Sequence, residues 1–174
     1  MREIFFMELK YGVLTGIACV IFRAFEFYMG WPDTELGQYS AYFGILLMAT
    51  GAYLCVVETR KSNHNKMNFG KAFYSAIVVC FIISIMMGAH AYVYNSTVDP
   101  QRKERMAQQF HDEMVKQKKT ETEIKQVEEN ARTYFSPMGQ VTAESGGNMI
   151  AGLFVSLVIA AFTRSKKKEV EIFS

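Results

Sequence analysis

The stretch "FYSAIVVCFIISIMMGAHAYVY", residues 73–94, contains no Asp, Glu, Lys or Arg. Its length matches the ~20 residues that an α-helix needs to cross a hydrocarbon core ~30 Å thick. A backbone surrounded by lipid must satisfy its own hydrogen bonds, and this run does not alternate between apolar and polar residues as a barrel strand does. The stretch therefore predicts a membrane-spanning helix.

Three further apolar blocks of similar length alternate with charged segments, at roughly residues 11–29, 39–57 and 147–163. Half of the 174 residues are hydrophobic, which would be unusually apolar for a soluble domain of this length. The sequence therefore predicts an all-α fold, a polytopic transmembrane four-helix bundle.

Lysines and arginines predict the orientation of the bundle. They gather after the second block and in the C-terminal tail, as Arg60, Lys61, Lys66, Lys71, Arg164, Lys166, Lys167 and Lys168. Short basic segments stay on the cytoplasmic side, so both termini are expected there. One group, Arg102, Lys103 and Arg105, lies on the side that this orientation makes external, and it favours the opposite arrangement.

Residues 99–137, between the third and fourth blocks, predict an extramembrane helical hairpin. Asp99 is a candidate N-cap followed by Pro100 at a first helical position, and "TETE" at residues 120–123 is typical of a capping box. Narrow apolar stripes follow each helix, formed by Met106, Phe110, Met114, Ile124 and Val127. The charges favour a solvated surface, and the stripes alternatively favour docking of a partner. The domains are therefore residues 1–98, 99–137 and 138–174.

Two charges stand inside the first apolar block. Arg23 and Glu26 continue a face begun by Gly12, Gly16 and Cys19, with spacings of 4, 3, 4 and 3. Small residues at such spacing let two helices approach closely, so the charged pair is expected to point into the bundle. Two interpretations remain: a salt bridge within the helix that stabilises packing, or the polar floor of an outward-facing cavity on an ion or substrate path.

His90 is expected at a similar depth to Arg23, near the external end of the third helix. It could complete a polar cluster with Tyr42 and Asn148, although a lone interfacial histidine is the simpler interpretation. The fourth helix carries its own stripe of small residues, Gly152, Ser156 and Ala160, which predicts close helix packing.

Other chemistry is largely absent from the sequence. Cys19, Cys55 and Cys80 all fall in apolar blocks without C-x-x-C spacing, so neither a disulfide framework nor a metal site is expected. There is no phosphate-binding loop, nucleophile elbow or dinucleotide fingerprint. The hairpin lacks the basic face of a nucleic-acid-binding surface. We therefore expect a protein without cofactor, without nucleic acid as a partner and without enzymatic activity.

The run "MNFGKAFYSAIVVCFIISIMMGAHAYVYNSTVDPQ", residues 67–101, resembles the third-helix signature of a bacterial membrane family, domain of unknown function 4199. The order of the remaining segments fits as well, with two earlier helices, a charged insert after "DP" and a last helix ending in "AAFTRSKKK". The resemblance implies a four-helix protein of the bacterial inner membrane, and it supplies no activity or catalytic residue.

These observations favour a non-enzymatic accessory or structural subunit of a membrane complex. Its expected partners are the lipid bilayer and other membrane subunits or further copies of itself. The alternative is a small oligomeric transporter or channel for an ion or small solute, in which Arg23, Glu26 and His90 lie near the outer mouth.

Overall fold

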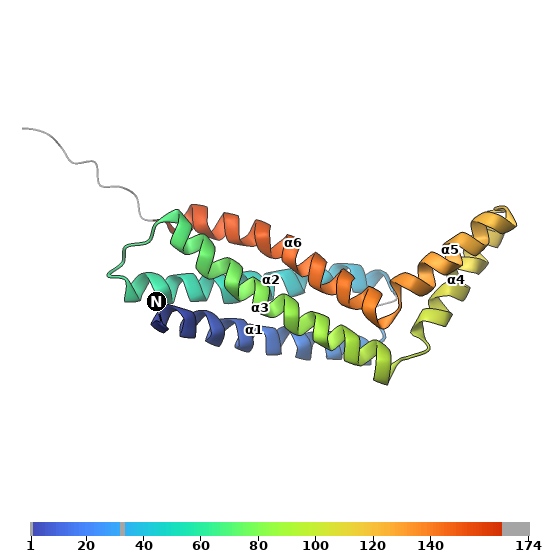
Figure 1. The fold of residues 1–174 in the computed structure, drawn as a ribbon, viewed down its shortest axis with the longest axis horizontal. Coiled ribbons are helices and arrows are strands. Elements are labelled where there is room, and N and C mark those ends of the chain that lie inside the picture. Colours follow the sequence, from blue (N-terminus) through green and yellow to red (C-terminus); the bar gives the residue numbers. More distant parts are fainter. Residues whose placement is uncertain (1, 32–33, 165–174) are drawn as a thin grey trace, which may run out of the picture. The chain divides into compact units, whose positions relative to one another are not determined.

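The computed structural model describes residues 2–31 and 34–164. Its α-helices are α1 (Arg2–Tyr28), α2 (Glu35–Ser62), α3 (Phe69–Val93), α4 (Arg102–Lys116), α5 (Glu121–Tyr134) and α6 (Pro137–Thr163) (Figure 1). A π-helical turn, η1 (Tyr94–Val98), follows α3 directly. The described residues contain no β-strand, so the predicted all-α fold is confirmed.

Four helical stretches are long and apolar enough to cross a membrane: Phe5–Tyr28, Tyr39–Ser62, Phe69–Val98 and Pro137–Thr163. The chain is thus a polytopic membrane protein, as the sequence predicted. The fourth span begins ten residues earlier than expected, because Pro137 starts α6 and does not merely end the hairpin. Proline is well tolerated at a first helical position, since its missing N–H would have no partner there.

The chain forms two compact units, each described here by itself. The first comprises residues 1–83 and 149–174, and the second comprises residues 84–148. The predicted domains, in contrast, follow the membrane spans and the hairpin, and they stay a prediction.

Small residues bring the helices of the first unit together. A Cβ atom on Gly12 of α1 would lie 2.8 Å from Ile82 Cδ1 of α3, and one on Gly152 of α6 would lie 2.6 Å from Cys80 Cβ. A side chain at Gly51 of α2 would likewise collide with Thr15 of α1. All three contacts need backbones that approach more closely than a larger residue allows.

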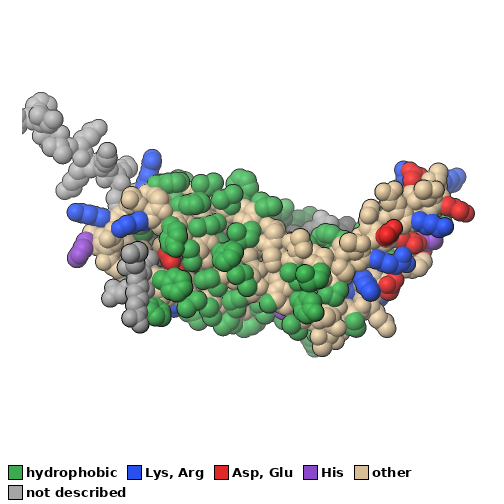
Figure 2. Space-filling view, viewed as in Figure 1, with side chains coloured by type: hydrophobic (Ala, Val, Ile, Leu, Met, Phe, Trp, Pro, Cys, Tyr) green, Lys and Arg blue, Asp and Glu red, His purple; other side chains and the backbone are tan. Residues whose placement is uncertain are grey.

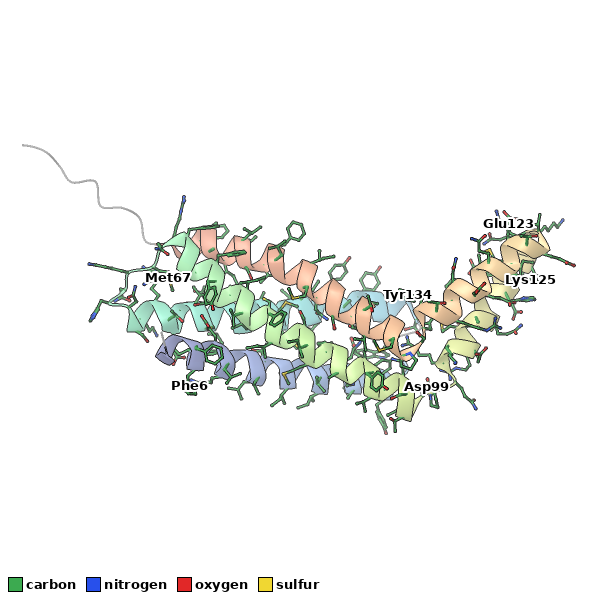
Figure 3. All side chains as sticks on the ribbon, in the orientation of Figure 1. Phe6, Met67, Asp99, Glu123, Lys125 and Tyr134 are labelled. Carbon is green, nitrogen blue, oxygen red and sulfur yellow. The ribbon has the colours of Figure 1, made fainter. Side chains whose placement is uncertain are left out.

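The interior of the first unit contains all three cysteines, together with a few buried polar side chains. Cys19, Cys55 and Cys80 are buried free thiols. The outer faces of the spans carry large hydrophobic side chains over most of their length, among them Phe6, which points away from the bundle (Figures 2 and 3). Water would not tolerate so much exposed apolar surface, whereas lipid does.

Two helices end in Schellman motifs, which satisfy the last carbonyl groups. At the end of α1, the N–H of Trp31 donates to Glu26 O and the N–H of Gly30 donates to Phe27 O, with Gly30 at φ 69°. At the end of α4, Lys119 and Lys118 make the equivalent bonds, but Lys118 adopts φ 55°. This left-handed conformation suits glycine and costs a residue that carries a Cβ atom.

Replacing Lys118 with glycine should therefore stabilise the α4–α5 hairpin, by about 0.5–1 kcal/mol. Hydrogen exchange of the α4 and α5 amides in the full-length protein measures this change, because the exchange rate of each amide reports the free energy of local opening at that residue. Lys116→Gly serves as the matched comparison. It places glycine in the last turn of the same helix and should weaken protection. Equal or weaker protection in Lys118→Gly would contradict the assignment of strain to this position.

The hairpin of α4 and α5 forms most of the second unit. Thr120 and Glu123 make the predicted capping box, since the Thr120 hydroxyl accepts from the Glu123 N–H while the Glu123 carboxylate accepts from the Thr120 N–H. Two polar contacts cross between the helices: a hydrogen bond between His111 and Glu128, and an ion pair between Arg132 and Glu104 at 3.0 Å. Glu123 and Lys125 lie near the α4–α5 turn (Figure 3).

The expected role of Asp99 as an N-cap is wrong. α4 begins at Arg102, and the Asp99 carboxylate instead receives two hydrogen bonds from the Arg105 guanidinium, at 2.8 and 2.7 Å. A bidentate guanidinium pair is stronger than a single bond to a backbone N–H, so the side chain turns toward α4 and away from its first N–H groups. The hydrogen bonds from Arg105 hold the pKa of the Asp99 carboxyl below its ordinary value.

Asp99→Asn should reduce the acid sensitivity of the second unit. Because the folded-state pKa lies below the unfolded value near ~4, the ion pair stabilises the fold above that value and ceases to do so as the pH falls through the folded-state pKa. The loss is about 0.5–1 kcal/mol, since Arg105 is half exposed. Hydrogen exchange of α4 at pH 6 and pH 3, corrected for intrinsic rates, measures it. Arg105→Gln should show the same reduction. An unchanged pH difference in both variants would exclude the pair as its source.

Candidate functional site

Arg23 and Glu26 form an ion pair inside α1. The Arg23 Nη1 to Glu26 Oε2 distance is 2.8 Å, and Glu26 is 1 % exposed while the side chain of Arg23 is 21 % exposed. The guanidinium also lies over the ring of Phe27, 5.4 Å from its centroid. Glu26 Oε1 is buried and makes no hydrogen bond to any described residue. Glu26 therefore depends on Arg23 for its charge compensation.

His90 belongs to the second unit. Its ring stacks on that of Tyr94 one turn further along the chain, with centroids 6.3 Å apart. Asn148 donates from Nδ2 to the Glu144 carbonyl oxygen of its own helix, and Tyr42, in the first unit, is exposed. The polar cluster expected from these residues stays a prediction.

The residues expected to pack helices occupy the following places. Gly12 and Gly152 lie against α3 as described, and Gly16 is buried on the same face of α1. On α6, Ala160 and Ser156 are fully buried, and the Ser156 hydroxyl donates to Cys80 Sγ at 3.8 Å.

The expected docking residues of the hairpin are half-buried. All five have intermediate exposure: Met106, Phe110, Met114, Ile124 and Val127. An open groove of about 250 Å³ lies beside them, lined by Phe110, Val127, Asn130, Ala131, Tyr134 and Phe135. The rings of Phe110 and Phe135 approach to 6.3 Å between centroids, and Tyr134 stands edge-on to Phe135 at 5.0 Å. The stripes are thus partly covered, and two of their residues, Phe110 and Val127, line an open aromatic groove.

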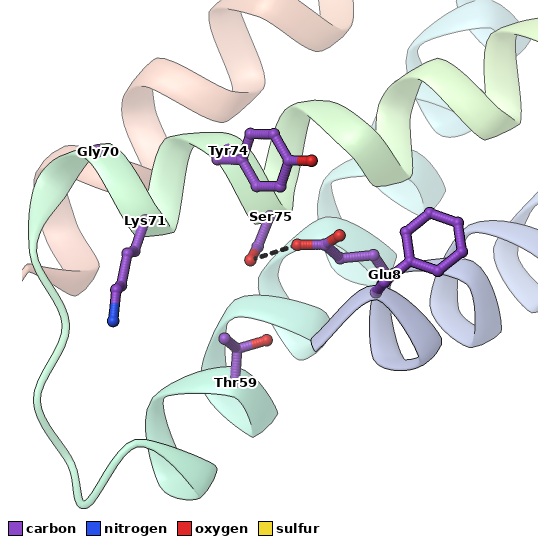
Figure 4. Close-up of a pocket in the computed structure, with 7 residues that line it drawn as sticks. Glu8, Thr59, Gly70, Lys71, Tyr74 and Ser75 are labelled. Atoms are coloured by element: carbon purple, nitrogen blue, oxygen red, sulfur yellow. Dashed lines mark hydrogen bonds between the residues drawn. The ribbon is translucent and has the colours of Figure 1, made fainter. Parts of the chain in front are cut away.

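A larger cavity, about 410 Å³, lies within the first unit where α1, α2 and α3 meet. Its lining residues are Phe5, Glu8, Thr59, Gly70, Lys71, Tyr74 and Ser75 (Figure 4). Glu8 is 1 % exposed, and the Ser75 hydroxyl donates to Glu8 Oε1 at 2.8 Å. A buried carboxylate therefore faces a cavity inside a membrane span.

Glu8 was not among the residues singled out from the sequence. The first apolar block expected from the sequence begins at residue 11 and therefore does not include Glu8. The helical spacing nevertheless contained the signal. Glu8 lies four residues before Gly12, which extends the face of Gly12, Gly16, Cys19 and Glu26 by one turn, and all five of these residues are buried.

Within residues 2–31 and 34–164, no group of three or more His, Cys, Asp or Glu side chains is arranged so that it could hold a metal ion.

Comparison with known proteins gives one match. The model of the family described as "Protein of unknown function (DUF4199)" matches residues 10–165. No curated protein and no solved structure matches the chain.

Proposed function

Since the chain belongs to the DUF4199 family, whose description names no activity, we propose from its geometry that it is a non-enzymatic accessory subunit of a membrane complex. The proposed setting is a bacterial inner membrane with both termini in the cytoplasm. The single observation that supports this role is the aromatic groove of the hairpin, which lies outside the four spans.

The groove has the chemistry of a protein-binding surface. Tyr134 is 55 % exposed, and it adjoins Phe110 and Val127 on a scaffold that ion pairs between α4 and α5 hold in place. Exposed aromatic residues around a small depression are common anchors for a partner side chain. The surrounding charges of both signs would form a polar rim.

Native mass spectrometry of protein extracted gently from its own membranes tests this role. Wild type should leave the membrane with a partner subunit, and Tyr134→Ala should lose that subunit. Gln126→Ala is the matched control, because Gln126 is exposed on α5 without lining the groove. Retention of the same partner by Tyr134→Ala would remove the groove from the interface.

A small oligomeric transporter or channel is the second candidate, supported by the Arg23–Glu26 pair inside α1. Ionisable residues inside membrane spans often mark ion or solute paths, and one Glu26 oxygen makes no hydrogen bond to any described residue. Replacing both residues with apolar ones separates the two candidates. Intact assembly with a lost flux in liposomes favours the transporter, whereas the absence of any flux from the wild type favours the subunit.

A further inference from the structure

We propose that the cavity between α1, α2 and α3 binds the head group of an ethanolamine phospholipid. The ammonium group enters toward Glu8, and the phosphate group stays near Lys71. This site is separate from the hairpin groove, so it stands or falls independently of the accessory role.

The buried carboxylate of Glu8 is the first reason to expect a ligand with a positive charge. Its Oε1 atom accepts from Ser75, and no Lys, Arg or His whose side chain is described forms an ion pair with it. A carboxylate with a single hydroxyl partner is costly to bury in a membrane span. A cationic ligand in the adjoining cavity would compensate that charge.

The cavity lining suits an ammonium group. Besides the carboxylate, the buried hydroxyl groups of Ser75 and Thr59 offer oxygen acceptors, and an ammonium group has three N–H donors to share among them. Phe5 and Tyr74 add aromatic rings, whose faces attract cations.

Lys71 favours a zwitterionic ligand, which also carries a negative group, over a simple cation. It lines the same cavity and is exposed. A second positive charge repels an isolated cation, whereas it attracts the phosphate that an ethanolamine head group carries next to its ammonium. The volume of about 410 Å³ is also far larger than a single ion needs, since one water molecule takes up ~30 Å³ in the liquid.

The cavity lies close to the head-group region of the bilayer. Glu8 lies three residues inside the span that begins at Phe5, and Thr59 lies three residues from the end of the span at Ser62. At ~1.5 Å per residue both positions are ~5 Å from the span ends. A span of 24 residues is ~36 Å long and extends ~3 Å beyond each side of a ~30 Å hydrocarbon core, so both positions lie ~2 Å inside the edge of the core, next to the head-group layer of the lipid.

Native mass spectrometry of the delipidated full-length protein in detergent tests this proposal. The probes are dihexanoyl-phosphatidylethanolamine, dihexanoyl-phosphatidylglycerol, which lacks the amine, and free phosphoethanolamine, which lacks the tails. Wild type should bind the ethanolamine lipid at least ~10-fold more tightly than either of the others. Glu8→Gln keeps the size of the side chain and an acceptor for Ser75, and it should abolish that preference.

Two further variants control the result. Glu58→Gln removes a carboxylate of α2 that already pairs with Lys10 and Tyr11 and does not line the cavity, so it should keep the preference. Lys71→Gln alters an exposed side chain, and it should weaken binding of the ethanolamine lipid several-fold. Equal lipid preference in wild type and Glu8→Gln, or tighter binding of phosphoethanolamine than of the lipid, would overturn the proposal.

Discussion

Arg23→Met should lower the free energy of unfolding by about 3–5 kcal/mol, the largest effect that we expect from a single substitution. The reason is that Glu26 is more deeply buried than Arg23. Glu26 is 1 % exposed, and Arg23 supplies its described ion-pair contact, so removing the guanidinium leaves a buried carboxylate without compensation. Titration with sodium dodecyl sulfate from mild micelles, followed by circular dichroism, measures the change.

Two comparisons make this result specific to the pair. Adding Glu26→Leu to Arg23→Met should recover most of the loss, because no buried charge then remains. Lys10→Met removes a cation from the more exposed Lys10–Glu58 pair, whose N–O distance is 3.6 Å, and should cost less than about 1 kcal/mol. If the double variant were as unstable as Arg23→Met, the damage would come from lost packing around Phe27 and not from the charge.

Gly152→Ala should destabilise the first unit by about 1–3 kcal/mol, the second-largest effect. The added methyl group would lie 2.6 Å from Cys80 Cβ, an atom fixed to the backbone of α3, so relief requires movement of a whole helix. The same titration measures the effect. Cys80 Sγ and Met48 Sδ lie next, at 3.3 and 3.5 Å, and neither can relieve the first contact.

Gly147→Ala is the matched control on the same helix. A Cβ atom at Gly147 would meet no other atom within 4 Å. Its stability should stay unchanged or rise by up to ~1 kcal/mol, because alanine is the better helix former. Equal stability of the two variants would show that α3 and α6 do not depend on close contact at Gly152.

The four spans were predictable because hydropathy over ~20 residues reports the environment of a whole helix. The capping box at Thr120 was predictable for a different reason, since it depends only on residues three positions apart. Both signals are local in the chain, and both are confirmed.

Glu8, Asp99 and Pro137 show where local signals failed. A hydropathy average over many residues hides a single carboxylate such as Glu8. The hydrogen-bond partner of Glu8, Ser75, lies 67 positions later in the sequence, so local patterns do not reveal it. Asp99 had two competing partners, and only the fold decides between a helix N-terminus and Arg105. Proline both ends one helix and begins the next, so its position alone does not fix where α6 starts.

The burial of Cys19, Cys55 and Cys80 has a practical consequence for chemical labelling. A thiol reagent that cannot cross the membrane has no exposed native cysteine to modify, because the sequence contains three cysteines and all are enclosed by the bundle. The natural chain can therefore be labelled directly, without first replacing its cysteines. A single cysteine introduced at the exposed Lys125 would report, by its reaction with such a reagent in intact cells, on which side of the membrane the α4–α5 turn lies.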